Sequence, residues 1–66
     1  MFIKTTNYDN NKALYINSNH ITSLEENKIL LTNNIILTTK VYIHNDYYTV
    51  KETPEKILTL IKEQNV

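Results

Sequence analysis

The stretch from Val41 to Ile61, VYIHNDYYTVKETPEKILTLI, constrains the fold more than any other part of the chain. It contains two segments in which apolar and polar side chains alternate, a pattern typical of strands with one buried face. A short polar break separates them, and a helix start follows. A two-residue turn at Asn45-Asp46 places Ile43 opposite Tyr48. The sequence therefore predicts a β-hairpin that leads directly into a helix.

The two faces of this hairpin differ in character. One face is apolar and is expected to form part of the core: Val41, Ile43, Tyr48 and Val50. The opposite face, called here the Tyr-rich face, supplies the candidate partner-binding residues: Lys40, Tyr42, His44, Tyr47 and Lys51. Three interpretations of this face stay open. They are ordinary cross-strand packing, a protein interface, and stacking of single-stranded bases beside lysine ammonium groups.

A helix start is encoded by Thr53-Pro54-Glu55. Threonine is a good N-cap, proline is tolerated at the first helical position, and a carboxylate is favourable near the positive end of the helix dipole. The helix is predicted to run from about residue 54 to residue 64. Its apolar stripe is expected to pack on the sheet and consists of Ile57, Leu58, Leu60 and Ile61.

A second hairpin is predicted between Ile29 and Thr38, with its turn at Asn33-Asn34. This register places Leu31 opposite Ile36 and leaves apolar side chains on both faces. The single predicted helix covers only one face of a sheet. Either the sheet closes into a small barrel, or Leu31 and Ile36 contact another chain. The second alternative is favoured, so these two residues are the candidates for an oligomer interface.

The remaining segments complete a small β-rich fold. Strands are predicted at Phe2–Thr6 and Ala13–Asn17, and another from His20 to Glu26, with the polar segment Glu25–Lys28 as a turn. The predicted fold class is α+β: one domain spanning residues 1–66, with a small antiparallel sheet or open barrel of five to six short strands and one C-terminal helix. A domain of this size buries only about 60% of its unfolded surface, so self-association is expected to add stability.

Composition argues against several classes of protein. The chain has no cysteine and two histidines, so neither a metal site nor a cofactor is expected. Seven lysines balance seven acidic residues and arginine is absent, which disfavours a strongly cationic nucleic-acid binder. Apolar runs are shorter than the roughly 20 residues of a membrane helix, and no signal-peptide pattern is present. A cytoplasmic location without membrane contact is therefore expected.

No motif in the sequence predicts catalysis. His44 lies two residues before Asp46, but no nucleophile or substrate pocket is indicated beside them. The adjacent acids Glu25 and Glu26 are interpreted as solvated side chains, because no desolvating pocket or partner acid is indicated. The chain is therefore predicted not to be an enzyme.

Asparagine is unusually frequent, with ten copies and no glycine in the chain. Because Asn tolerates the left-handed backbone conformation better than most residues, it is expected to supply the positive φ angles of tight turns. The same bias is typical of an AT-rich coding sequence, such as that of a low-GC bacterium or its phage. A phage-encoded accessory protein or inhibitor of a host factor is therefore one alternative function.

Two segments carry a family pattern: Leu14–Glu25, LYINSNHITSLE, and Tyr48–Ile57, YTVKETPEKI. They resemble the small FlbD-like proteins, named from bacterial flagellar operons. In that family a strand ending in Ile-Asn precedes a strand ending in an acidic residue, and a Tyr-x-Val-Lys-Glu-Ser/Thr run leads into the last helix. The resemblance implies a non-enzymatic, oligomeric β-rich protein that works through contacts. The chain departs from the family pattern between Asn27 and Lys40, where it carries an additional hairpin.

The sequence thus predicts a non-enzymatic protein-interaction module that self-associates and binds a protein partner. Two alternatives remain at this point. One is binding of single-stranded nucleic acid through the Tyr-rich face, and the other is the phage-encoded accessory role.

Overall fold

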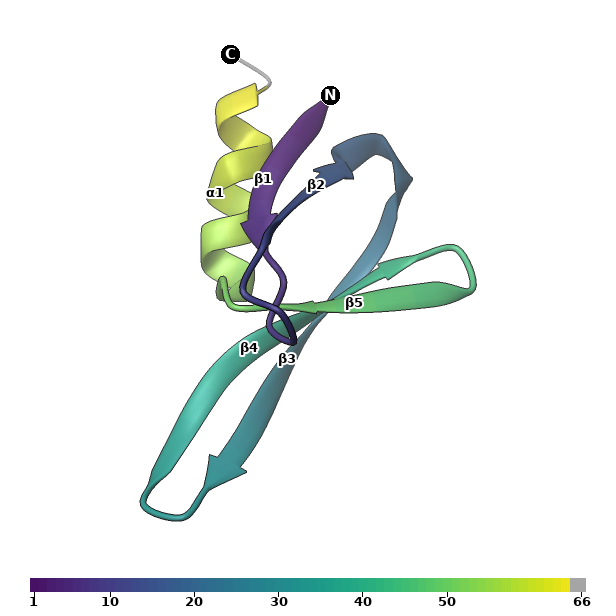
Figure 1. The fold of residues 1–66 in the computed structure, drawn as a ribbon. Helices are drawn as coiled ribbons and strands as arrows, with labels where there is room; N and C mark the ends of the chain where they lie inside the picture. Colours follow the sequence, from purple (N-terminus) through teal and green to yellow (C-terminus); the bar gives the residue numbers. More distant parts are fainter. Residues whose placement is uncertain (65–66) are drawn as a thin grey trace.

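The computed structural model describes residues 1–64, which form five strands and one C-terminal α-helix (Figure 1). The strands are β1 (Phe2–Thr6), β2 (Ala13–Asn17), β3 (Ile21–Leu31), β4 (Asn34–Ile43) and β5 (Asp46–Val50). The helix is α1 (Pro54–Gln64), and the 3₁₀ turn η1 (Ser18–His20) connects β2 to β3. A mostly β chain with one C-terminal helix is confirmed. Residues 65 and 66 of the predicted domain lie outside the described residues.

The strands form two antiparallel sheets, β1-β2 and β3-β4-β5. The sheets meet where β1 ends, because Asn7 forms a β-bridge with Val50. Beside this bridge, the backbone N–H of Lys51 donates to the carbonyl oxygen of Thr6 at 2.9 Å. The strand order across the junction is therefore β2-β1-β5-β4-β3. This order leaves β3 as an outer strand of the larger sheet.

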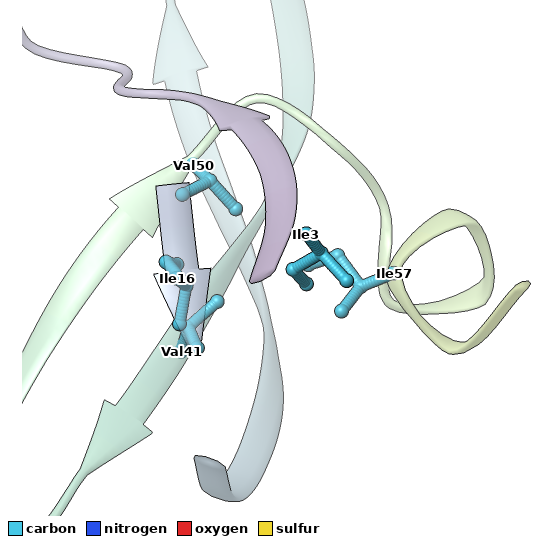
Figure 2. Packing of buried hydrophobic residues seen from close by; sticks show 5 residues of the cluster. All are labelled: Ile3, Ile16, Val41, Val50 and Ile57. Atoms are coloured by element: carbon cyan, nitrogen blue, oxygen red, sulfur yellow. The ribbon is translucent and has the colours of Figure 1, made fainter. Parts of the chain in front are cut away.

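The core lies where the β1-β2 sheet, the β4-β5 junction and α1 meet (Figure 2). Its buried apolar residues are Ile3, Ile16, Val41, Val50 and Ile57. Figure 2 shows the side chains of Ile3 and Ile57 directed toward one another between β1 and the helix. Five medium-sized side chains make a small core, as expected for a domain of this length.

The predicted helix start is confirmed. The backbone N–H of Lys56 donates to the side-chain oxygen of Thr53 at 3.3 Å, so Thr53 acts as the N-cap. The N–H of Ile57 donates to the carbonyl oxygen of the same threonine at 3.0 Å. Pro54 is the first helical residue and Gln64 is the last one in the helix. The local capping signal therefore fixes the position of α1.

The predicted apolar stripe of α1 is correct for three of its four residues. Ile57 is fully buried, and Leu60 and Ile61 are partly buried against the core. Leu58 is 58% exposed, so its assignment to the core stripe is wrong. The reason is helical phase: residues three and four apart share a face, whereas adjacent residues do not. Leu58 therefore lies on the outer side of the helix.

Both hairpin turns lie one residue earlier than predicted. The turn centres are Thr32-Asn33 and His44-Asn45, in place of Asn33-Asn34 and Asn45-Asp46. In each hairpin the first residue after the turn accepts a hydrogen bond from the next amide. Asn34 Oδ1 accepts from the N–H of Ile35 at 2.9 Å, and Asp46 Oδ1 accepts from the N–H of Tyr47 at 2.8 Å. These polar side chains therefore stabilise the strand starts and not the turn centres.

This shift corrects the predicted cross-strand partners. The observed pairs include Val41 with Tyr48, Ile43 with Asp46, and Leu31 with Asn34. Each partner has moved by two residues, and side chains alternate with a period of two, so every side chain stays on its predicted face. The predicted core face is confirmed for Val41 and Val50, which are fully buried. Tyr48 lies closer to the turn and is 40% exposed, so its assignment to the core is wrong.

The polar segment Glu25–Lys28 lies inside β3, so its prediction as a turn is wrong. Cross-strand partners hold it in an extended conformation. Glu25 lies opposite Lys40, and Asn27 lies opposite Thr38. The Asn27 amide donates to Thr38 Oγ1 at 3.2 Å, and that hydroxyl donates to the Asn27 carbonyl oxygen at 3.1 Å. Pairs of this kind stabilise a sheet. The predicted strands on either side of this segment are therefore one strand of 11 residues.

Positive φ angles occur at Asn11 (60°) and His44 (55°). The expectation that asparagine takes this conformation is confirmed at Asn11 and wrong in the β4-β5 turn, where the adjacent histidine takes it. Replacing His44 by glycine is expected to raise the free energy of unfolding by about 0.5–1 kcal/mol, because glycine has no Cβ to clash in the left-handed region. Urea denaturation measures this change. The control is His44→Ala, which keeps the Cβ, and an equal gain there would contradict the backbone explanation.

Candidate interaction surface

Three residues of the predicted Tyr-rich face lie together on the β4-β5 hairpin. Tyr42 and Tyr47 are cross-strand partners, with ring centroids 5.5 Å apart and ring planes tilted by 43°. The Lys40 ammonium nitrogen lies 5.2 Å from the centroid of the Tyr47 ring, within the range of a cation–π contact. Tyr47 is nevertheless 48% exposed, so a ring of the pair is accessible to a partner.

Glu25 joins the Tyr-rich face from β3. It lies opposite Lys40, and the Tyr42 hydroxyl donates to Glu25 Oε1 at 3.3 Å. A carboxylate beside the lysine balances the charge of this face, and a balanced face attracts phosphate groups less than a basic one. The sequence did not indicate this residue, because its segment was expected to be a turn. No local signal marked a continuous strand here, because the chain has no glycine and its single proline is Pro54, so the absence of both residues between Ile21 and Leu31 is uninformative.

The other two predicted partner-binding residues make different contacts. His44 is in the β4-β5 turn, and its ring centroid lies 5.6 Å from that of His20. Lys51 follows β5, and its ammonium group donates to Asn11 Oδ1. The structure thus brings Lys40, Tyr42 and Tyr47 into contact with one another, whereas His44 and Lys51 contact His20 and Asn11.

The β3-β4 hairpin extends beyond the rest of the sheet as a two-stranded arm, defined here as residues 27–38. Strand β5 pairs with β4 only from Thr39 to Ile43, so residues 34–38 pair with β3 alone. Figure 1 shows this arm projecting away from α1 and from the β1-β2 sheet. Neither the helix nor the smaller sheet covers the end of the arm.

The arm exposes large apolar side chains on both faces. Their exposed fractions are 75% for Leu30, 56% for Ile35, 50% for Leu31 and 43% for Leu37. Leu30, Ile35 and Leu37 lie on the face that continues toward Val41. The opposite face carries the predicted oligomer-interface residues Leu31 and Ile36, together with Ile29. Ile36 is partly buried and lies opposite Ile29, not opposite Leu31 as predicted.

The outer edge of β3 is the second unusual feature of the arm. Strand β3 pairs with β4 on one side. Among residues 1–64, no other backbone hydrogen bond outside the β3-β4 ladder involves its residues from Thr22 onward. An unpaired edge of this kind presents backbone donors and acceptors to another strand. The candidate site is therefore a surface built from an apolar arm, an open strand edge and the adjacent Tyr-rich face.

Residues 1–64 form no pocket. Within the same residues, no three or more His, Cys, Asp or Glu side chains gather in a way that would hold a metal ion. Their single α-helix is also too short and too polar to cross a membrane.

Comparisons with models of protein families, with curated proteins and with solved structures find no match to this chain. The resemblance to FlbD-like proteins therefore stays a prediction from its two segments. In the structure, the segment Leu14–Glu25 runs from β2 through η1 into β3, and the segment Tyr48–Ile57 runs from β5 into α1.

Proposed function

We propose that this protein is a non-enzymatic protein-interaction module that self-associates and binds a protein partner. The observation that carries the proposal is the apolar arm, which exposes Leu30, Leu31, Ile35 and Leu37 on its two faces. Burying a large aliphatic side chain contributes about 1.5–3 kcal/mol, so a partner that covers several of them gains substantial free energy. The small core supports the same proposal, because association compensates for the little apolar surface that the chain buries alone.

The Tyr-rich face is the surface proposed for the protein partner. Tyrosine is enriched at protein interfaces, since its ring supplies a large contact area and its hydroxyl a hydrogen bond. Tyr42 and Tyr47 lie in contact here, and Tyr47 is about half exposed. Because Lys40 lies opposite Glu25, the positive charge of this face is balanced, which suits a protein surface better than a phosphate backbone.

Binding of single-stranded nucleic acid is the second candidate, because the rings of Tyr42 and Tyr47 could stack on bases. Fluorescence polarisation with labelled oligonucleotides at low salt tests it. We expect no binding. Binding that is lost in Tyr47→Ala would favour this candidate over the protein partner. The phage-encoded accessory role rests on composition alone, and the genomic neighbourhood of the coding sequence tests it.

Two finer features belong to the same proposal. One is a cytoplasmic location, which rests on the apolar runs of the sequence being shorter than a membrane helix requires. The other is an open barrel in which the two sheets act as one body, supported by the bridge between Asn7 and Val50. The FlbD-like resemblance agrees with an oligomeric protein that works through contacts.

Self-association is expected to depend on the arm. The wild-type chain should sediment with a mass above the 7.8 kDa of one chain, and the fraction associated should rise with concentration. Replacing Leu30 by lysine is expected to weaken association about tenfold or more, which corresponds to about 1.4 kcal/mol. The control is Leu58→Lys, which makes the same change at an exposed position of α1. A strictly monomeric wild type at millimolar concentration would contradict the proposal.

A further inference from the structure

The regular part of β3 offers a long free edge. The register irregularity of the β3-β4 ladder falls between Ile21 and Ser23, and each of the nine residues Ser23–Leu31 then has a β4 partner. In an antiparallel ladder, the N–H and C=O groups of every second residue point toward one neighbour and those of the remaining residues point toward the other side. Every second one of these nine residues therefore directs its backbone groups outward, where another strand can pair with them.

The simplest strand to pair with this edge is β3 of a second copy. In an antiparallel pair, residues directly opposite each other either exchange both backbone hydrogen bonds or exchange neither. The outward groups belong to every second residue of β3. An even-numbered residue must therefore lie opposite an even-numbered residue of the second copy, and an odd-numbered residue opposite an odd-numbered one. A two-fold axis then passes beside a single residue, which faces itself across the interface. This rule leaves only a few registers.

Charge selects among these registers. An axis at Glu25, Glu26 or Lys28 places identical charges directly opposite each other, which is destabilising. An axis at Asn27 instead places Glu26 opposite Lys28 of the second copy, and symmetry creates this pair twice. Opposite charges in directly opposed positions stabilise a sheet. Asn27 is therefore the residue at which two copies of this strand are complementary.

Strand length selects the same register independently. Asn27 is the central residue of Ser23–Leu31, so an axis there pairs all nine residues of the regular edge. An axis at Leu24 or Ile29 leaves much of each edge unpaired. In the central register, Leu24 lies opposite Leu30 of the second copy. Leu30 is 75% exposed in the single chain, so it gains an apolar neighbour that it otherwise lacks.

Glu26 and Lys28 are available for such a contact. Both are exposed, and within the chain they lie opposite the uncharged residues Thr39 and Leu37. Glu25, by contrast, already lies opposite Lys40 of its own chain. The charged residues that the central register would pair are thus the two on β3 without a charged partner across the β3-β4 ladder.

We infer that the self-associated form is a two-fold symmetric dimer in which the β3 edges of two copies pair antiparallel about Asn27, with Glu26 of each opposite Lys28 of the other. The three-stranded sheets of the two copies then form one continuous sheet. This inference rests on the proposed self-association and adds to it the partner, a second copy of this chain, and the register of the contact.

Charge reversal tests the register. Glu26→Lys and Lys28→Glu each create two pairs of like charge, so each variant alone is expected to associate about tenfold more weakly than the wild type, or worse. An equimolar mixture of the two variants restores opposite charges at both positions. We expect it to form a heterodimer about as tightly as the wild type forms its homodimer. Native mass spectrometry with one variant ¹⁵N-labelled measures this. The matched controls are Glu63→Lys and Lys62→Glu on α1, which should leave association unchanged.

A single thiol provides a second measurement, because the chain has no cysteine. Asn27→Cys places a thiol opposite its own copy, and it is expected to form a disulfide-linked dimer faster under air oxidation than Glu25→Cys, which lies opposite Ile29 of the second copy. Equal rates of cross-linking would overturn the register. If the wild type associates while both charge reversals and their mixture associate equally well, the register is wrong and the proposed self-association stands. A monomeric wild type would contradict both the proposed register and the proposed self-association.

Discussion

Replacing Ile57 by alanine is expected to lower the free energy of unfolding by about 2–5 kcal/mol, because it removes methylene and methyl groups from the core and leaves a cavity. Ile57 is fully buried and is the only residue of α1 in the described chain with that degree of burial. A single core in a domain this small supplies little more than about 3–5 kcal/mol in total. The variant is therefore expected to be largely unfolded at 25 °C, as circular dichroism with urea denaturation would show.

The neighbouring residue supplies a matched control for this experiment. Leu58→Ala truncates a similar aliphatic side chain in the same turn of α1, but Leu58 is 58% exposed. A surface substitution of this kind is expected to change the free energy of unfolding by no more than about 0.5 kcal/mol. Equal losses at the two positions would mean that α1 does not dock through Ile57. The comparison thus tests the rotational phase of the helix.

The helix shows what local sequence signals determine and what they leave open. Its first residue follows from Thr53 and Pro54, because capping involves only neighbouring residues. Its buried face does not, since Ile57 and Leu58 are equally apolar. Ile57 is selected by contact with Ile3, which lies at the other end of the chain. The start of the helix was therefore predictable from the sequence, whereas the buried member of an adjacent apolar pair was not.

In the strands, too, local sequence signals determine some features and leave others open. Alternation identified β1 and β2 with their observed bounds, because both are short and flanked by polar turns. The polar centre of β3 was misassigned because its stabilising partners Lys40 and Thr38 are more than ten residues away. The turns were misplaced by one residue because Asn34 and Asp46 accept hydrogen bonds within the strand starts. Sequence patterns alone do not distinguish that role from a turn centre.

The candidate surface was predictable where it depends on side-chain parity. Lys40, Tyr42 and Tyr47 share a face because strand residues alternate. Moving the two-residue turn by one residue shifts each cross-strand partner by two residues, so these side chains stay on the same face. Glu25 was missed because it reaches this face from the strand that was predicted to end there. The open edge was missed for the same reason, since a turn at Glu25–Lys28 would have interrupted it.

Glu52 is a structural residue that the sequence did not single out. It lies between β5 and α1, and its carboxylate accepts two hydrogen bonds from one residue at the end of β1. The backbone N–H of Thr6 donates to Glu52 Oε1 at 2.8 Å, and the Thr6 hydroxyl donates to Oε2 at 3.0 Å. The Glu52 carbonyl oxygen accepts from the hydroxyl of the buried Thr39 at 2.7 Å. The hydrogen bonds of this one residue therefore connect β1 and β4 to the segment that leads into α1.

Glu52→Ala is expected to lower the free energy of unfolding by about 1.5–3 kcal/mol, the range for hydrogen bonds to a charged group. The loss has two causes: both bonds disappear, and the Thr6 amide is left without its acceptor. Glu52→Gln keeps one side-chain oxygen as an acceptor, so it is expected to cost less than the alanine variant. Urea denaturation of the three proteins under identical conditions measures these differences.

A double-mutant cycle tests whether these bonds are the cause. Thr6→Val keeps the shape of the side chain and removes only the hydroxyl that donates to Glu52. In the wild-type background this change is expected to cost about 0.5–1.5 kcal/mol, and in the Glu52→Ala background close to nothing, because the acceptor is already gone. Fully additive losses would contradict a direct interaction. Since neither residue belongs to β3 or to the arm, these variants should retain self-association whenever they are folded, which separates loss of stability from loss of the proposed interface.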